Sequence, residues 1–339
     1  MSKLLRLSLF MSCMAFSAWS QADAALLANP EVGAFIDQRV QEDGMDRTAL
    51  EQLFTQVQLK PSIISILDRP STSRPWFQFR PNFVNTALSK EGLNFWVRHE
   101  AELARAEQKY GVPPEIIIAI LGVETRFGRL AGSFRVVDAL STIAFGYPRR
   151  ADYFKGELRD FLRLAQEEGG SPLLYKGSYA GAMGWPQFMP SSFRKWAVDF
   201  DGDGHRDIWN NSADAIGSVA NYLKEHGWQR NADMVVPADV KKVTNVDVLV
   251  ADKFQLHYTI ADLRAKGVVP QSPVPNSVKA VVFPLETQPG VIEYWLGLEN
   301  FYVITRYNKS TLYAKAVGDL AGMIREAWVI RMANKAAPQ

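Results

Sequence analysis

The sequence predicts a mainly α-helical fold with a small strand-rich domain. Apolar residues recur at helical spacing in several stretches, at about 25–65, 93–110, 151–168, 213–227 and 312–330. After Gly227 the pattern changes to short apolar runs, such as 278–282 and 301–305, which proline and glycine separate and which are typical of strands. Residues 68–81 are rich in proline, serine and arginine, and we expect an extended segment there.

The composition is that of a globular protein of more than one core. A chain of 339 residues predicts one large domain or two to three smaller ones. The net charge of +2 is too balanced to indicate a nucleic-acid-binding protein. Nine Trp, eleven Tyr and nineteen Phe suit sugar binding and core packing equally, so their number does not identify a function.

The first 24 residues are typical of an export signal. Lys3 and Arg6 form a basic start, an apolar stretch follows over 7–16, and Ala22-Asp23-Ala24 supplies a small-x-small cleavage site. The apolar stretch is too short to span a membrane. We therefore expect an exported, periplasmic protein from which the signal peptide, 1–24, is removed.

The single cysteine, Cys13, lies inside this signal. The mature chain would then have no disulfide, no thiol nucleophile and no thiolate metal site. Cys13 could instead be the acylated residue of a bacterial lipoprotein, but Phe10-Met11-Ser12 matches the usual preceding pattern poorly. We favour a soluble periplasmic protein over a lipid-anchored one.

The most informative predicted helix runs over 115–127. Pro113 and Pro114 lie where the first turn of a helix tolerates proline, and Gly128 lies where a C-terminal cap belongs. The residues between them are apolar nearly all round, so we expect the helix to be buried.

Glu124 on this helix is the candidate catalytic residue. It shares a face with Ile117, Ile120 and Leu121, so its carboxyl should lose water on one side and its pKa should rise. A general acid needs such an environment, because it must hold its proton near neutral pH. The helix alone leaves open the alternative of a helix-end glutamate paired with a nearby arginine such as Arg126.

Two motifs together are more specific. Residues 122–128, Gly-Val-Glu-Thr-Arg-Phe-Gly, resemble the glutamate segment of the lytic transglycosylase relatives of goose-type lysozyme. Residues 178–191, Ser-Tyr-Ala-Gly-Ala-Met-Gly-Trp-Pro-Gln-Phe-Met-Pro-Ser, resemble the second signature of the same group. The likeness to the lytic murein transglycosylase B family, with its membrane-bound and soluble members, runs from about residue 30 to about 330, through segments at 138–142, 147–150, 215–222 and 299–308.

The resemblance implies a lysozyme-like core and lytic transglycosylase activity on peptidoglycan glycan strands. Glu124 would donate a proton to the glycosidic oxygen between N-acetylmuramic acid and N-acetylglucosamine, through an oxocarbenium-like state. The same carboxylate would then take a proton from the muramoyl 6-hydroxyl, which attacks its own anomeric carbon and forms a 1,6-anhydro sugar. A second catalytic carboxylate is dispensable because the nucleophile is tethered in the substrate. The sequence does not exclude one, since Asp138, Asp152, Glu157 and Asp160 lie nearby along the chain.

The resemblance also implies substrate-binding residues. Ser178 and Gln187 would contact Glu124 or the acetamido sugars. Arg149 and Arg150 would hold the lactyl carboxylate or the peptide stem, unless this pair is only solvated. Groove positions of the family are matched by Tyr222, Tyr307, Asn308 and Tyr313, although buried tyrosines are also common in cores. Phe79 falls where relatives can carry tyrosine, which would keep an aromatic platform without the hydroxyl.

Residues 199–210, Asp-Phe-Asp-Gly-Asp-Gly-His-Arg-Asp-Ile-Trp-Asn, resemble a calcium loop. On the twelve-residue EF-hand pattern, Asp199, Asp201 and Asp203 take positions 1, 3 and 5, and His205 offers its carbonyl at position 7. Asn210 stands at position 12, where a carboxylate is usual, so affinity should be modest and Na⁺ could compete. We expect a structural Ca²⁺ rather than a metal-free Asp-Gly turn, no organic cofactor, and no zinc site, because the four histidines lack paired spacing.

These observations predict four parts: a signal peptide (1–24), an N-terminal helical domain (25–105) joined by 301–339, a catalytic core with the EF-hand-like loop (106–230), and a small β-rich domain (231–300). The rival interpretations are a muramidase that adds water with a second carboxylate, and a non-catalytic wall-binding scaffold. The sequence leaves open the endo- or exo-acting mode, the preference for peptide-bearing or bare strands, the oligomeric state, and partners among cell-wall synthases or amidases.

Overall fold

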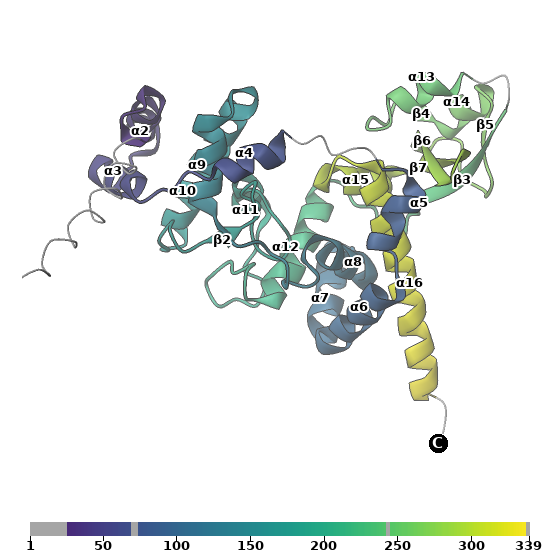
Figure 1. Ribbon diagram of the computed structural model, residues 1–339. Helices are drawn as coiled ribbons and strands as arrows, with labels where there is room; N and C mark the ends of the chain where they lie inside the picture. The colour runs from purple at the N-terminus through teal and green to yellow at the C-terminus, as the bar shows by residue number, and fades with distance from the viewer. Residues whose placement is uncertain (1–25, 69–73, 242–244, 337–339) are drawn as a thin grey trace, which may run out of the picture. The chain divides into compact units, whose positions relative to one another are not determined.

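The computed structural model describes residues 26–68, 74–241 and 245–336, so the expected signal peptide and Cys13 lie outside the described residues. The described chain is mainly helical with one larger sheet, which confirms the predicted fold class (Figure 1). It forms two compact units, each described here by itself. The first unit comprises 26–68, 132–183 and 188–194, and the second comprises 74–131, 184–187, 195–241 and 245–336. The four-part division expected from the sequence stays a prediction.

The first unit is built on a packed pair of helices, α9 (Val136–Gly146) and α10 (Ala151–Glu167), joined by the 3-10 turn η2 (Pro148–Arg150). Their facing sides are apolar, and burial of side chains such as Leu140, Phe154 and Phe161 holds them together. The remaining elements are α2 (Pro30–Asp43), α3 (Arg47–Thr55), α4 (Pro61–Leu67), most of α11 (Pro190–Trp196), and the antiparallel strands β1 (Phe134–Arg135) and β2 (Lys176–Gly177).

The second unit is organised around α8 (Pro114–Thr125), which packs against four other helices. Pro114 begins the helix, where its missing N–H costs nothing, and every residue from Ile116 to Gly122 is buried. The surrounding helices are α6 (Thr86–Arg98), α7 (Glu100–Tyr110), α12 (Ser212–Glu225) and α16 (Thr311–Ala336). The helix α15 (Glu299–Tyr307) contacts α12 and α16, so the end of the chain returns to the helix that carries Glu124 (Figure 1).

A five-stranded antiparallel sheet completes the second unit, with the strand order β4-β6-β7-β3-β5. Its strands are β3 (Val235–Val240), β4 (Tyr258–Thr259), β5 (Val268–Pro270), β6 (Lys279–Gln288) and β7 (Val291–Gly297). Two short helices, α13 (Val246–Ala251) and α14 (Ile260–Ala265), contact β6 and β5 and close a separate apolar core around Ile260, Leu263 and Val282. No helix of the described residues is both long and apolar enough to cross a bilayer.

Several local predictions are wrong. The segment expected to be extended contains the short helices α5 (Trp76–Phe79) and η1 (Arg80–Asn82). Residues 301–305, expected to be a strand, lie in α15, because burial of Phe301 and Ile304 three positions apart on one helix face outweighs their strand propensity. The helix expected over 93–110 is two helices, since the backbone of His99 leaves the helical conformation between them.

Candidate active site

Glu124 lies in the last turn of α8, at the point where the buried helix ends. The helix stops at Arg126 (φ 48°) rather than at Gly128, which corrects the predicted cap. Arg126 and Phe127 both adopt the left-handed conformation, and their N–H groups donate to the carbonyls of Gly122 (3.0 Å) and Leu121 (3.1 Å). The chain therefore turns sharply just after Glu124.

The carboxyl of Glu124 has a much higher pKa than an ordinary glutamate. The side chain is partly exposed, as a residue that must reach a substrate has to be, yet burial of its carboxyl raises the pKa to about 7. The hydroxyl of Tyr313 on α16 donates to Oε1 at 2.6 Å and lowers the pKa, but burial has the larger effect. Burial, and not the charge of a second acid, thus shifts this carboxyl toward the range of a general acid.

Three tyrosines from three helices lie around Glu124. Burial raises the pKa of Tyr313 and of Tyr307 well above the usual value, and the nearby charge of Glu124 adds to the effect. Both phenols therefore stay protonated donors at neutral pH. The ring of Tyr307 meets that of Tyr222 at 4.8 Å between centroids, and the hydroxyl of Tyr222 donates to the carbonyl of Arg306 at 2.7 Å.

The residues 184–187 of the second motif are fastened to the end of α8. Thr125 is fully buried, and its hydroxyl donates to the carbonyl of Trp185 (3.0 Å) while accepting from the N–H of Gly128 (2.9 Å). The hydroxyl of Tyr307 donates to the carbonyl of Pro186 at 2.6 Å. Gln187 has a left-handed backbone (φ 54°), and its amide donates to the carbonyls of Ala131 (3.2 Å) and Gly184 (2.9 Å).

Gly184 explains why this loop needs glycine. It adopts φ 65°, and a Cβ there would lie 2.5 Å from the carbonyl oxygen of Ile208. The close approach lets the N–H of Trp185 donate to the same carbonyl at 2.9 Å.

The structure thus gathers Glu124, Gln187, Tyr222, Tyr307 and Tyr313 in the second unit, while other predicted substrate-binding residues lie elsewhere. Asn308, at the end of α15, is exposed. Ser178, Arg149 and Arg150 belong to the first unit. The hydroxyl of Ser178 accepts from the N–H groups of Ala180 (3.3 Å) and Ala182 (3.0 Å). Arg149 and Arg150 are exposed on η2, with the guanidinium of Arg150 5.0 Å from the ring centroid of Tyr153.

Three carboxylates near the motifs in sequence are engaged within the first unit. Asp138 pairs with Arg135 at 2.8 Å, Asp160 pairs with Arg194 at 2.7 Å, and Glu157 accepts from the hydroxyl of Ser191 at 2.8 Å. Their hydrogen bonds hold helices and loops of that unit together.

The aspartate loop gathers three carboxylates, which come from Asp199, Asp201 and Asp203 and whose oxygens lie within 4.8 Å of one another. The N–H of Gly204, at 2.8 Å, is the main cause that lowers the pKa of Asp199, so this group stays ionised. Convergent carboxylate oxygens are the ligands that Ca²⁺ prefers, so these residues fit the ion.

The rest of the loop is tied to α12. The amide nitrogen of Asn210 donates to the carboxylate of Asp207 at 3.1 Å. The carboxylate of Asp214, on α12, accepts from the N–H groups of Phe200 (2.7 Å) and Asp207 (2.8 Å), and these bonds connect both ends of the loop to the helix.

Sequence reasoning missed two residues of the site. Thr125 joins the motif glutamate to the second motif, and Trp185 packs its indole on Gly128, where a Cβ would come within 2.2 Å of the ring nitrogen. The signal for Thr125 was a hydroxyl residue in an otherwise apolar buried helix. The contact of Trp185 is between residues distant in sequence and had no local signal.

Comparisons with known proteins show the family of this chain. Residues 28–322 match the family described as the transglycosylase SLT domain. The chain is 45% identical over 311 residues to membrane-bound lytic murein transglycosylase B of Escherichia coli K12, covering 89% of this chain and 84% of that protein.

Two solved structures are similar over most of their length. Soluble lytic transglycosylase SltB1 from Pseudomonas aeruginosa has a TM-score of 0.83 and 47% identity, covering 88% of this chain and 99% of that one. The Escherichia coli lytic transglycosylase Slt35, solved in complex with calcium, has a TM-score of 0.80 and 44% identity, covering 89% and 94%. These matches cover most of the chain, and it therefore belongs to the lytic transglycosylase family.

Proposed function

We propose that this lytic transglycosylase uses Glu124 as its single catalytic acid and base. It cleaves the β-1,4 bond between N-acetylmuramic acid and N-acetylglucosamine in peptidoglycan and leaves a 1,6-anhydromuramoyl end. The observation that carries the assignment is the carboxyl of Glu124, whose pKa burial raises to about 7 at the end of a helix and beside two protonated phenols.

The geometry supports both proton transfers. A carboxyl with a pKa near 7 carries a proton in a large fraction of molecules at neutral pH and can give it to the glycosidic oxygen. Once ionised, it keeps the hydrogen bond from Tyr313, which stabilises the carboxylate until it accepts a proton from the muramoyl 6-hydroxyl. The attack is intramolecular, so catalysis needs one carboxylate rather than two.

Substrate binding is proposed for the residues of the second unit that lie around this carboxyl. Tyr313 donates to Glu124, Tyr307 lies close enough for the charge of Glu124 to raise its pKa, and the ring of Tyr222 packs on that of Tyr307. Gln187 belongs to the segment that Thr125 and Tyr307 hold at the end of α8. The roles proposed for Ser178, Arg149, Arg150 and Asn308 follow the family resemblance. Arg149 and Arg150 are exposed, so their guanidinium groups are accessible to a carboxylate.

The aspartate loop is proposed to hold a structural Ca²⁺ through Asp199, Asp201, Asp203, the carbonyl of His205 and Asn210, as in an EF-hand. The ion would supply only positive charge that ties the loop to α12, and no step of catalysis uses it. We further propose that the protein acts as a soluble enzyme in the periplasm after removal of its signal peptide.

The muropeptide mass profile tests the catalytic assignment. Purified sacculi digested by the protein should yield products lighter by one water than reducing-end muropeptides. Glu124→Gln keeps the shape of the side chain but cannot donate or accept this proton, so the rate should fall at least about a hundredfold.

Glu115→Gln is the matched control, because Glu115 lies in the first turn of the same helix. This variant should keep the activity. Products with reducing ends only would instead show a muramidase, and an undiminished rate in Glu124→Gln would show that another residue is the catalyst.

A further inference from the structure

The turn that follows Glu124 is strained, and packing rather than glycine holds it. Arg126 and Phe127 adopt φ angles of 48° and 60°, a region that residues with a Cβ seldom enter. The ring of Phe127 packs back on α8, where a Cβ on Gly122 would lie 3.1 Å from it, and stacks on Phe95 of α6 with centroids 4.9 Å apart. Such a conformation persists only where its surroundings fix it.

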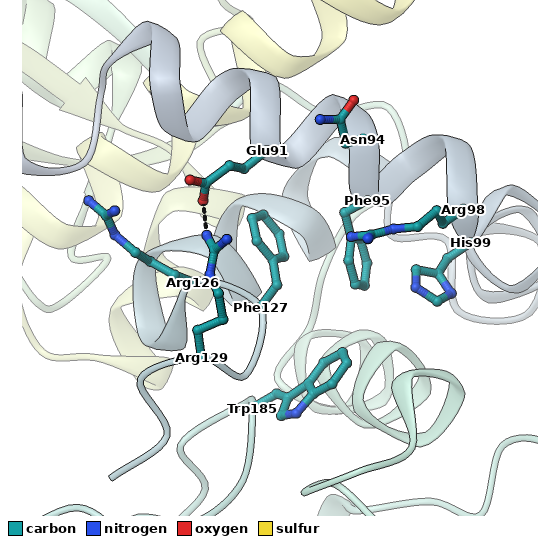
Figure 2. Close-up of a pocket in the computed structure, with 9 residues that line it drawn as sticks. All are labelled: Glu91, Asn94, Phe95, Arg98, His99, Arg126, Phe127, Arg129 and Trp185. Carbon is teal, nitrogen blue, oxygen red and sulfur yellow. Dashed lines mark hydrogen bonds and ion pairs between the residues drawn. The ribbon is translucent and has the colours of Figure 1, made fainter.

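The side chain of Trp185 is part of these surroundings (Figure 2). Together with α6 and the turn after α8 it lines a cavity of about 450 Å³, which Arg98 and Arg126 also line. Its ring meets that of Phe95 edge-on, with 6.3 Å between centroids. It also lies on Gly128, where a Cβ would come within 2.2 Å of the indole nitrogen. The indole therefore packs on the residue that ends the turn and on the ring that supports it.

The backbone of Trp185 connects the aspartate loop, 199–210, to the end of α8. Its N–H donates to the carbonyl of Ile208 at 2.9 Å, and its own carbonyl accepts from the hydroxyl of Thr125 at 3.0 Å. Ile208 is fully buried, and only glycine fits at Gly184, because a Cβ there would lie 2.5 Å from the carbonyl oxygen of Ile208. Trp185 thus contacts the loop through its backbone and the turn through its ring.

The two halves of the aspartate loop differ in charge and burial. The first half carries Asp199, Asp201 and Asp203, whose carboxylate oxygens lie within 4.8 Å of one another and repel when no cation lies between them. The second half carries the buried Ile208. The carboxylate of Asp214 accepts from one N–H in each half and so joins them. A cation that draws the three carboxylates together would therefore also order the half that Trp185 contacts.

We propose that Trp185 is a positioning residue that holds the turn after Glu124 against the aspartate loop, so that an ordered loop keeps the catalytic carboxyl in place. The proposal rests on the proposed function, because it takes Glu124 as the acid and base. Within the described residues, the titratable or charged groups that interact with Glu124 are Tyr313 on α16 and Tyr307 on α15. Both phenols are protonated at neutral pH, so a shifted pH profile would report on the water around Glu124.

The pH dependence of peptidoglycan cleavage tests the contact with the turn. In Trp185→Leu the ring that packs on Gly128 is lost, so water should reach the carboxyl of Glu124 and its pKa should fall toward 4.5. The alkaline limb of kcat/KM should move to lower pH by at least about half a unit. The value of kcat should fall at least about tenfold, while KM should change less than about twofold.

Trp328→Leu is the matched control, because Trp328 is a half-buried tryptophan of the same unit that stacks on Trp96, 4.5 Å away. It should leave the alkaline limb in place. An unchanged limb in Trp185→Leu, whatever its rate, would overturn the proposal.

Gly184→Ala tests the contact with the loop. The new Cβ would displace the carbonyl of Ile208, so the alkaline limb should again move to lower pH. Gly290→Ala is its control, since this glycine is also left-handed (φ 75°) but a Cβ there meets nothing within 4 Å. A parent-like limb in Gly184→Ala would show that the loop does not position the carboxyl.

Hydrogen exchange of the full chain tests the connection without turnover. The N–H groups of 126–128 donate hydrogen bonds within the turn, so their exchange reports on its order. Ca²⁺ should slow exchange in 199–210 and, at least about threefold, in 126–128 of the parent. In Trp185→Leu the slowing should persist in 199–210 and be lost in 126–128.

The outcomes separate this proposal from the others. Slowing confined to 199–210 in the parent, or slowing of 126–128 that survives Trp185→Leu, would overturn it. No slowing in either segment would refute the calcium site, and the pH profiles would then decide the role of Trp185. An undiminished rate in Glu124→Gln would refute the proposed function, while hydrogen exchange would still decide whether the loop and the turn are connected.

Discussion

At the residue scale, Glu124 shows how a fold raises the pKa of a glutamate until it can act as a general acid. Water is removed from the carboxyl by a helix that is apolar nearly all round, and this raises the pKa to about 7. The hydrogen bond from Tyr313 acts in the opposite direction and keeps the ionised form accessible. The two effects together hold the group where it can both give and take a proton.

Removal of the Tyr313 hydroxyl should therefore move the pH profile of the enzyme. In Tyr313→Phe the carboxylate of Glu124 loses a donor, so its pKa should rise above that of the parent. The fall of kcat/KM on the alkaline side, where the general acid loses its proton, should shift to higher pH. Tyr302→Phe, one helix earlier, is the control and should leave the profile in place. A shift to lower pH in Tyr313→Phe would contradict this account of the hydrogen bond.

At the element scale, the end of α8 and the residues 184–187 act as one piece. The hydroxyl of Thr125 bonds to both, and the phenol of Tyr307 holds the same segment from α15. Because all three contacts are buried or partly buried, water does not replace them easily when one partner is removed.

Thr125→Val tests this connection, since it keeps the shape and deletes the hydroxyl. The carbonyl of Trp185 and the N–H of Gly128 would lose their partner, which should lower the free energy of unfolding by about 1–3 kcal/mol. Urea denaturation measures the change. Thr55→Val removes an exposed hydroxyl that donates to the carbonyl of Gln52, and should cost less than about 0.5 kcal/mol. Equal effects of the two substitutions would show that the buried hydroxyl does not join the segments.

The aspartate loop is the second element with a measurable consequence. If Ca²⁺ binds only the folded loop, a concentration one hundred times the Kd should stabilise the protein by about 2.7 kcal/mol and raise the melting temperature. Asp201→Asn/Asp203→Asn should abolish the rise, because two of the three convergent carboxylates lose their charge. Asp233→Asn, at an exposed position outside the loop, should keep it. An equal rise with NaCl at matched ionic strength would rule out a selective calcium site.

At the scale of the whole molecule, the raised pKa of Glu124 makes stability depend on pH. The unfolded chain binds this proton with a pKa of 4.5 and the folded chain with a pKa of about 7. Below pH 4.5 both states are protonated and the group costs nothing. Between pH 4.5 and pH 7 the folded chain keeps the proton that the unfolded chain has lost, so the free energy of unfolding falls as pH rises. Above pH 7 both states are ionised, and the folded protein bears the full cost of burying the carboxylate.

Glu124→Gln removes this cost. At pH 8 the variant should be more stable than the parent by about 3 kcal/mol, and at pH 4.5 the difference should be small. Thermal unfolding at both pH values measures it. Glu326→Gln, on the exposed side of α16, is the control and should follow the parent at both pH values. A difference that grows toward acid pH would mean that the carboxyl is stabilised in its ionised form.

The helical class, a buried helix after Pro113 and a raised pKa for Glu124 could be predicted from the sequence, because spacing along one helix states which residues share a face, although the predicted end of the helix was wrong. The strand predicted at 301–305 was wrong, because burial on one helix face outweighs strand propensity there and the segment lies in α15. The fold was needed to show that Tyr313, far along the chain, donates to Glu124, that Thr125 bonds to Trp185, and that Arg98 and Arg126 line one cavity. These contacts join residues distant in sequence, and their formation depends on how helices pack rather than on any periodicity within one helix.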